Sequence, residues 1–264
     1  MFLVQTLIVS RHGIRSPFPP NYGTTSDFTS YTNKIFPNND SWGMSADAFR
    51  QQHLTPHGKK IVPYMGAYNA ERLAVDGLQF SDCTDVVCFA DDNERDILTA
   101  ELWLQGMGCQ NVTVKIVNST SYPEMQSVVQ DHYDVGCLPA TEDMVKGLYG
   151  GNPNTYTDMY ATQIQTVMDV LDMPPDAKIC SLTNAHHNDS QSCTLFDTGY
   201  QWTGRVYDGT FKGPVYFAKY FAVHWMLQYL SNVTDWAFGM LTYQQLNNLY
   251  VLEVANLWFG TNYW

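Results

Sequence analysis

Two short runs of charged and polar residues have the composition needed for chemistry on a phosphate group. They are Arg11-His12-Gly13-Ile14-Arg15-Ser16-Pro17 and Asp91-Asp92-Asn93-Glu94-Arg95. The chain has 14 Lys and Arg residues, yet three arginines fall in these two runs. Arginine carries a fixed fork of N–H donors that suits phosphate oxygens. A histidine between two arginines has a lowered pKa and stays neutral, as a nucleophile must.

Each run follows a segment that we expect to be a buried strand. Phe2–Ser10 precedes the first run, and Val86–Ala90 precedes the second. Ligands of open α/β sheets bind just beyond the carboxyl ends of strands. The second run also begins a helix through about Gln105, stopped by Gly106, and free N–H groups at a helix N-terminus favour an anion. Both runs are therefore placed where a phosphate would bind.

The remaining elements suggest an α/β core that carries a helical part. A helix begins at Thr55-Pro56, with Pro63 as a kink, and Val112–Val117 alternates as a third strand. Later helices are expected over Thr157–Asp172, over Pro214–Leu230, and from Thr242 towards Trp258 with Gly260 as the stop. We predict an α/β fold with a mixed central sheet flanked by helices and a mostly helical subdomain. The expected division is residues 1–120 for the α/β core, 121–240 for the helical subdomain and 241–264 for a helix returning to the core.

Charge and hydropathy exclude two classes of partner. With 26 Asp and Glu residues, the 264-residue chain has a formal net charge of −12. Such a field repels nucleic acids and anionic membrane surfaces. No apolar run is long enough to span a bilayer. A small anionic substrate remains compatible with the composition, provided that a few cations converge in one pocket.

Cysteines and glycosylation signals indicate an oxidising compartment. Six cysteines occur without CxxC spacing, and five Asn-X-Ser/Thr sequons begin at residues 39, 111, 118, 188 and 232. We expect a secreted protein or one of the lysosomal or vacuolar lumen. A cytosolic protein with accidental sequons is the alternative, because residues 1–9 lack a basic start and a cleavage site. We expect that a leader is absent from this sequence.

The first run carries a resemblance to a known family. Arg-His-Gly-X-Arg-X-Pro is the signature of the histidine acid phosphatases, which form branch 2 of the histidine phosphatase superfamily. Residues 54–58, Leu-Thr-Pro-His-Gly, are similar to a second element of that family, and residues 89–95 to its second arginine block. Gly213-Pro214 and the following helix resemble the corresponding region of bacterial-type phytases and glucose-1-phosphatases. The resemblance extends from residue 2 to about 258.

The resemblance implies a phosphoglycerate mutase-like architecture, a mechanism and a set of site residues. His12 would take the phosphoryl group as phosphohistidine, with no metal and no cofactor. Three arginines would clamp the phosphate, namely Arg11, Arg15 and Arg95. Asp91 matches an acidic position that acts as an acid or in support. The ligand would be a small phosphorylated substrate or inorganic phosphate, and the family pattern implies disulfides between Cys83 and Cys109 and between Cys180 and Cys193.

One family element is missing from the sequence. Relatives carry a late His-Asp pair whose aspartate protonates the leaving oxygen, and no His-Asp dipeptide occurs here. We therefore expect a C-terminally incomplete member of the family. Its function is predicted as hydrolysis of phosphomonoesters such as phytate or sugar phosphates, with a phosphate-binding pseudoenzyme or inactive fragment as the alternative. Transfer of the phosphoglycerate mutase kind is disfavoured by the Arg15-Ser16-Pro17 ending, the sequons and the expected disulfides. A metal site at His186-His187 is less favoured than a solvated loop.

Overall fold

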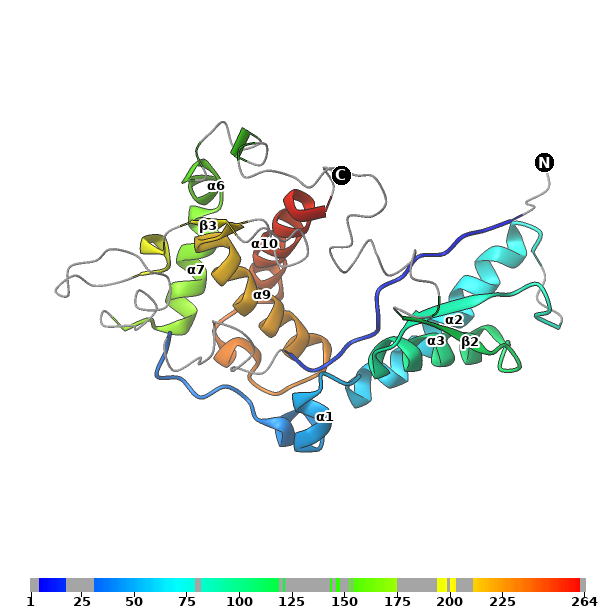
Figure 1. Ribbon diagram of the computed structural model, residues 1–264. Coiled ribbons are helices and arrows are strands. Elements are labelled where there is room, and N and C mark those ends of the chain that lie inside the picture. Colours follow the sequence, from blue (N-terminus) through cyan, green and yellow to red (C-terminus); the bar gives the residue numbers. More distant parts are fainter. Residues whose placement is uncertain are drawn as a thin grey trace. The chain divides into compact units, whose positions relative to one another are not determined.

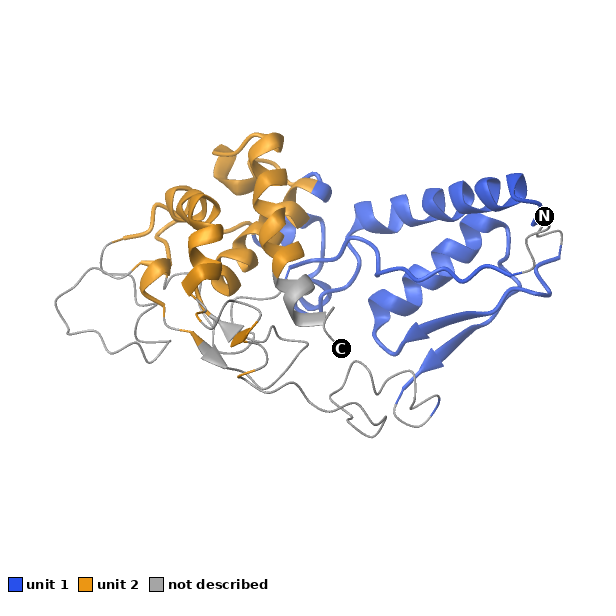
Figure 2. Ribbon diagram, turned by 90° about the horizontal axis from the view of Figure 1, so that it is seen from above, with its two compact units in different colours: residues 1–17, 38–128, 230–232 blue, residues 18–37, 129–229, 233–264 orange. Residues whose placement is uncertain are grey.

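We describe the protein from a computed structural model of the 264-residue chain. The structure describes residues 5–17, 31–78, 82–118, 121, 143, 146, 147, 152, 154–174, 194–198, 200–202 and 211–261. By their contacts the residues fall into two compact units, coloured separately in Figure 2. Unit 1 comprises residues 1–17, 38–128 and 230–232, and unit 2 comprises residues 18–37, 129–229 and 233–264.

Unit 1 is built from two long helices and a parallel pair of strands. Helix α2 spans Pro56–Val75 and α3 spans Glu94–Met107 (Figure 1). Strands β1 (Cys88–Asp91) and β2 (Val114–Val117) pair in parallel, as the connection through α3 requires. α3 contacts both α2 and the strands, so the three layers follow one another (Figure 2). Two short helices precede them, η3 (Asn39–Trp42) and α1 (Ala46–Arg50). The α/β class predicted from the sequence is confirmed.

The helix starts in unit 1 follow from local sequence. Thr55 is the N-cap of α2 and its side chain accepts from the Gly58 N–H, while Pro56 takes the first helical position. The predicted stop of α3 at Gly106 is wrong. Helix α3 continues to Met107 and ends on Gly108, whose φ of 83° is the left-handed conformation that glycine adopts without strain.

The strand predicted for residues 2–10 is a second error. Residues 5–10 form no strand and are exposed, with Leu7 at 85% and Val9 at 87%. A run of apolar residues becomes a strand only when a neighbouring strand satisfies its backbone groups. Within the described ranges, β1 pairs with β2 alone, so residues 5–10 have no strand beside them. The motif that follows is held by other contacts.

Unit 2 is a helical assembly around one apolar core. It contains α6 (Asn154–Met159), α7 (Ala161–Leu171), η5 (Leu195–Asp197), α9 (Pro214–Leu230), η6 (Trp236–Gly239) and α10 (Tyr243–Thr261). A short antiparallel pair, β3 (Gln201–Trp202) and β4 (Phe211–Lys212), precedes α9. α9 has the bounds predicted for it. The single helix predicted over 157–172 is instead two helices separated at Tyr160.

The core of unit 2 joins α7, α9 and α10. Fully buried side chains in it include Ile164, Trp225 and Leu249. The last helix therefore shares its core with α7 and α9. Its predicted stop at Gly260 is wrong, since α10 passes through that residue. None of the helices in the described ranges is long and apolar enough to cross a membrane.

Candidate phosphate site

The first motif is held in place by the turn that leads into α2. The Thr55 N–H donates to the Ile14 carbonyl at 2.9 Å, and the Ser16 N–H donates to the His53 carbonyl at 3.1 Å. Between these bonds Arg15 and Leu54 form an antiparallel bridge. The motif thus acquires a strand-like partner even though residues 5–10 have none.

The second motif is tied to the first through one hydroxyl group. The Gly13 N–H donates to Thr99 Oγ1 at 2.9 Å, and the same hydroxyl donates to the Arg95 carbonyl at 2.6 Å. Thr99 is buried and lies one helical turn after Arg95 in α3. The hydroxyl bridge fixes the backbone beside His12 relative to the helix turn that carries Arg95.

The imidazole ring of His12 is held by a hydrogen bond to the backbone. Its Nδ1 lies 2.8 Å from the Gly13 carbonyl oxygen. A carbonyl only accepts, so Nδ1 carries the proton and Nε2 keeps its lone pair in the neutral ring. Burial, together with the positive charges of Arg15, Arg11 and Arg95, lowers the pKa of His12 to about 4 against the hydrogen bond to Gly13, which raises it. The imidazole therefore remains neutral and reactive well into the acidic range.

The three arginines predicted as the clamp share one electrostatic effect, because the positive charge of each lowers the pKa of His12. Arg15 is only 3% exposed and donates from Nη1 to the Ser16 carbonyl at 2.7 Å. Arg95 is mostly buried, and Arg11 is exposed. Three guanidinium groups beside a neutral imidazole can bind the oxygens of a phosphate while its phosphorus faces the ring.

Asp91 is the last residue of β1, and its carboxylate accepts hydrogen bonds within the turn that follows. Its Oδ1 accepts from the Asp92 N–H at 2.7 Å, and its Oδ2 accepts from Asn93 Nδ2 at 2.9 Å. These bonds shape the turn that connects β1 to α3. Both carboxylate oxygens of Asp91 are therefore engaged in this turn.

Sequence reasoning missed three further polar groups at the site. Asp96 lies beside Arg95, with 3.6 Å between Arg95 Nε and Asp96 Oδ2. His53 Nδ1 lies 3.7 Å from Glu94 Oε2. Thr99 stands four residues after Arg95, and that helical spacing was the signal that could have linked them. The approach of His53 to Glu94 joins distant parts of the chain and left no signal in the sequence.

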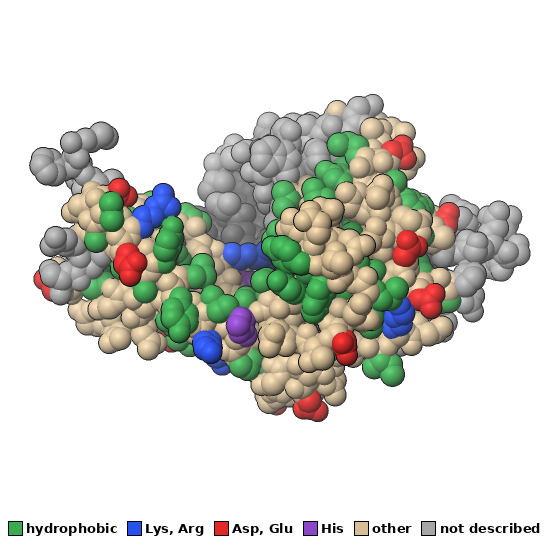
Figure 3. Space-filling model, turned by 180° about the vertical axis from the view of Figure 1, so that it is seen from behind, with side chains coloured by type: hydrophobic (Ala, Val, Ile, Leu, Met, Phe, Trp, Pro, Cys, Tyr) green, Lys and Arg blue, Asp and Glu red, His purple; other side chains and the backbone are tan. Residues whose placement is uncertain are grey.

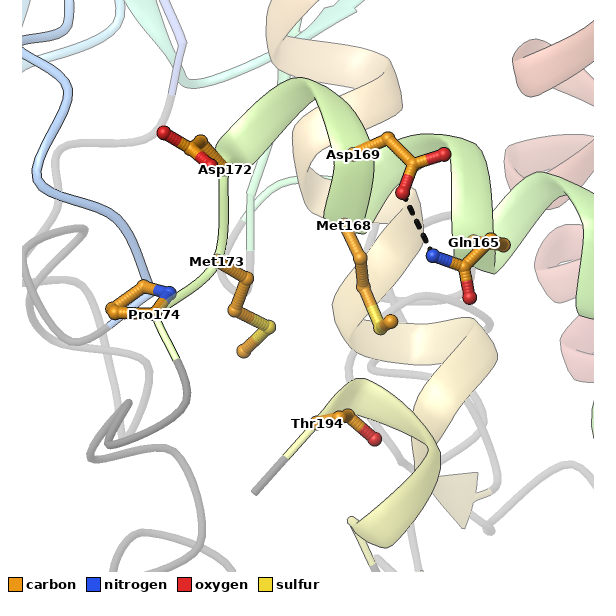
Figure 4. A pocket seen from close by; sticks show the side chains of 7 residues that line it. All are labelled: Gln165, Met168, Asp169, Asp172, Met173, Pro174 and Thr194. Atoms are coloured by element: carbon orange, nitrogen blue, oxygen red, sulfur yellow. Dashed lines mark hydrogen bonds between the residues drawn. The ribbon is translucent and has the colours of Figure 1, made fainter. Parts of the chain in front are cut away.

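The pocket drawn in Figure 4 is a separate feature of unit 2. It has a volume of about 310 Å³ and lies at the end of α7 and the start of η5. Asp169 and Asp172 contribute carboxylates, and Asp169 accepts from Gln165 at 2.8 Å. Its seven lining residues include neither Lys nor Arg. The two carboxylates would repel an anion, so this pocket is no alternative phosphate site.

On the face drawn in Figure 3, the acidic side chains stand apart from one another and do not form a single patch. Within the described ranges, no group of three or more His, Cys, Asp or Glu residues is arranged to hold a metal ion.

The cysteine predictions divide by position. Cys83 and Cys109 form the expected disulfide, which lies in a small apolar cluster with Leu104. Cys180 and Cys193 lie outside the described residues, as do His186 and His187. Cys88 carries a thiol whose pKa is raised by burial.

The chain is similar to several known phytases. It is 30% identical over 128 residues to "Phytase AppA" of Escherichia coli (strain K12), a match that covers 46% of this chain and 27% of the relative. The structure superposes on Hafnia alvei phytase in complex with tartrate with a TM-score of 0.67 and 21% identity, covering 93% of this chain and 57% of that one. The phytase from Citrobacter braakii gives a TM-score of 0.68 at 20% identity, with 94% and 58% coverage. The chain thus spans less than two thirds of the length of these relatives.

The family model agrees with the motifs. The model of the histidine phosphatase superfamily (branch 2) matches residues 3–260, which contain both arginine-bearing runs. The structural matches show the same fold over nearly all of this chain. The chain therefore belongs to branch 2 of the histidine phosphatase superfamily.

Proposed function

We propose that the protein hydrolyses phosphomonoesters through a phosphohistidine at His12. The observation that carries this proposal is the state of His12, a neutral ring with its Nε2 lone pair available and three guanidinium groups nearby. Family membership supports phosphatase chemistry in general. Arg11, Arg15 and Arg95 are proposed to hold the phosphate.

The first step forms one bond and breaks one. His12 Nε2 attacks phosphorus, an N–P bond forms, and the bond from phosphorus to the ester oxygen breaks. The negative charge on the equatorial oxygens is stabilised by the guanidinium groups. In the second step water attacks phosphorus, the N–P bond breaks, and phosphate and neutral histidine are released. Thr99 supports both steps by fixing the Gly13 backbone next to the ring.

The fate of the leaving oxygen distinguishes two candidate functions. An alkoxide needs a proton as it departs, and a positioned acid contributes roughly 10²–10⁴-fold. The sequence candidate for that acid, Asp91, has both oxygens engaged in the turn before α3. This observation favours, as the second candidate, a phosphate-binding protein that transfers phosphoryl groups from activated esters only.

For the substrate we propose a polyphosphorylated polyol such as phytate. The support is the naming of the relatives as phytases, one of which is in complex with myo-inositol hexakis sulphate. For the location we propose an oxidising compartment outside the cytosol. The disulfide between Cys83 and Cys109 supports it, because such bonds persist where thiols are not kept reduced.

The test is phosphate release at about pH 5, where carboxylic acids still donate protons. p-Nitrophenyl phosphate and phytate are compared, using the wild type and His12→Ala. His57→Ala is the control, since His57 lies in the first turn of α2 and has no role in the proposed mechanism. Release from both substrates, lost in His12→Ala and kept in His57→Ala, is the expected result.

Two other results are informative. Release from the nitrophenyl ester alone supports the second candidate, because nitrophenolate departs without a proton. Equal release by His12→Ala and the wild type would refute the proposal, since the nucleophile would lie elsewhere.

A further inference from the structure

A carboxylate lies against the clamp, on the side of Arg95 that carries Nε. Asp96 belongs to the first turn of α3, as does Arg95, and its Oδ2 lies 3.6 Å from Arg95 Nε. Both side chains are only 20% exposed. Arg95 Nε is buried and has no hydrogen-bond acceptor among the described residues. The carboxylate of Asp96 is thus an anion in the position from which it attracts the guanidinium group.

Four other charged groups act on Asp96. Arg95, Arg15 and Arg11 favour its ionised form, while Asp91 disfavours it. Burial is the largest influence and outweighs the arginines, so the pKa of Asp96 is raised above its ordinary value. Asp96 therefore takes up its proton earlier than an exposed aspartate as the pH falls.

We propose that Asp96 is a positioning residue that holds the Nε side of Arg95 and, when ionised, weakens anion binding by the clamp. The proposal rests on the phosphate-binding role proposed for Arg11, Arg15 and Arg95. Ionised Asp96 offers Arg95 an internal anion and adds a negative charge beside the bound oxyanion. Protonated Asp96 no longer places this competing negative charge beside Arg95. The clamp then binds anions more tightly in acid than at neutral pH.

The effect is reciprocal because protons and the oxyanion are linked ligands. If protonation of Asp96 strengthens anion binding by some factor, the bound anion strengthens proton binding by the same factor. Couplings of this kind amount to about 5–150-fold. We expect the lower part of that range, because Asp96 contacts one arginine of the three.

The probe is inorganic sulfate, which resembles phosphate and remains a dianion across the pH range tested. Its dissociation constant is measured by calorimetry from about pH 4 to pH 8 for the wild type and Asp96→Asn. For the wild type, the dissociation constant for sulfate is expected to rise about fivefold or more as Asp96 ionises. Asp96→Asn is expected to bind sulfate tightly even at neutral pH. Its only remaining change in sulfate affinity with pH should be the one caused by titration of His12.

Controls separate charge from structure. Glu101→Gln makes the same charge change at an exposed position of the same helix and should follow the wild type. Asp96→Glu keeps a titrating carboxyl and should restore the pH dependence. His12→Gln removes the neighbouring titrating group without touching Asp96, and sulfate binding should still weaken as the pH rises.

Three results would count against the proposal. Identical profiles for Asp96→Asn and the wild type, or a flat profile for His12→Gln, overturn the role of Asp96 and leave the clamp intact. If the wild type binds no sulfate at any pH, the clamp itself is refuted, and the role of Asp96 with it.

Discussion

Replacing Gly58 by alanine tests whether the turn before α2 sets the position of the phosphate motif. A Cβ at Gly58 would overlap the carbonyl oxygen of Ile14, and would lie 3.0 Å from the carbon of that group. Carbon atoms pack comfortably at about 3.5 Å, so the carbonyl carbon must move by roughly 0.5 Å and its oxygen further. Ile14 lies between His12 and Arg15, and the same carbonyl accepts the Thr55 N–H bond at 2.9 Å. The motif must therefore shift or lose that bond.

The expected cost is larger for activity than for stability. Overpacking of this kind costs about 1–3 kcal/mol of unfolding free energy. A misplacement of about 1 Å at a reacting group costs about 10²-fold in rate. We therefore expect Gly58→Ala to remain folded and to lose between about tenfold and a hundredfold in kcat/KM for p-nitrophenyl phosphate.

Gly66→Ala is the matched control. Its Cβ would collide with the Trp103 backbone of α3, away from the motif, so it should lower the melting temperature while a folded sample keeps most of its activity. Activity is read from nitrophenol release, and folding from thermal unfolding by circular dichroism. If folded Gly58→Ala has wild-type kcat/KM, the turn does not position the motif and the reasoning fails.

Three further predictions concern separate contacts. Thr99→Val leaves the Gly13 N–H without its acceptor, so it should lower the unfolding free energy by about 1–3 kcal/mol and also weaken sulfate binding. Thr99→Ser should preserve stability and sulfate affinity. Thermal melting measures the stability, and calorimetry measures the affinity. Cys83→Ser opens the disulfide to Cys109, which closes 26 residues, and should lower the unfolding free energy by about 3.5 kcal/mol in denaturant titrations; an unchanged midpoint would contradict this estimate. Burial lowers the pKa of His224 from 6.5 to about 3. Between these two pH values the unfolded chain binds more protons than the folded chain, so the unfolding free energy falls as the pH drops through this range. His224→Leu should flatten that fall in melting temperature, and a slope equal to the wild type's would exclude His224 as its cause.

The parts of the fold that depend on neighbouring residues were predictable from the sequence. The start of α2 at Thr55-Pro56 and the Thr242 box before α10 are local patterns of side-chain and backbone groups, and both are present. Gly106 shows where local reasoning fails. A glycine ends a helix only where the chain turns left-handed, and Gly106 is needed instead for the close approach of α3 to Pro63.

Contacts between distant segments could not be predicted. The apolar run before the first motif has the composition of a strand, but strand formation depends on a partner elsewhere in the chain. At the candidate site, the motif pattern identified His12 and the arginines as candidates. The hydrogen bond from Gly13 to Thr99 spans 86 positions, and His53 approaches Glu94 from another part of the chain. Residue types and spacing within each motif do not predict either contact.

The glycine contacts between α2 and α3 have a consequence for how the sequence can vary. At Gly66 and Gly106 any side chain would collide with the backbone of the opposite helix, at Trp103 and at Pro63. Gly106 lies 11 residues after Arg95 on α3, about 16 Å along the helix axis. In a library of all single substitutions, changes at these two positions should lower stability more than changes at exposed positions of the same helices, although neither glycine belongs to the candidate phosphate site. Selection for phosphate chemistry would thus also constrain positions that are remote from the reacting groups. A map of tolerated substitutions would identify the contact between α2 and α3 as clearly as it identifies the three arginines.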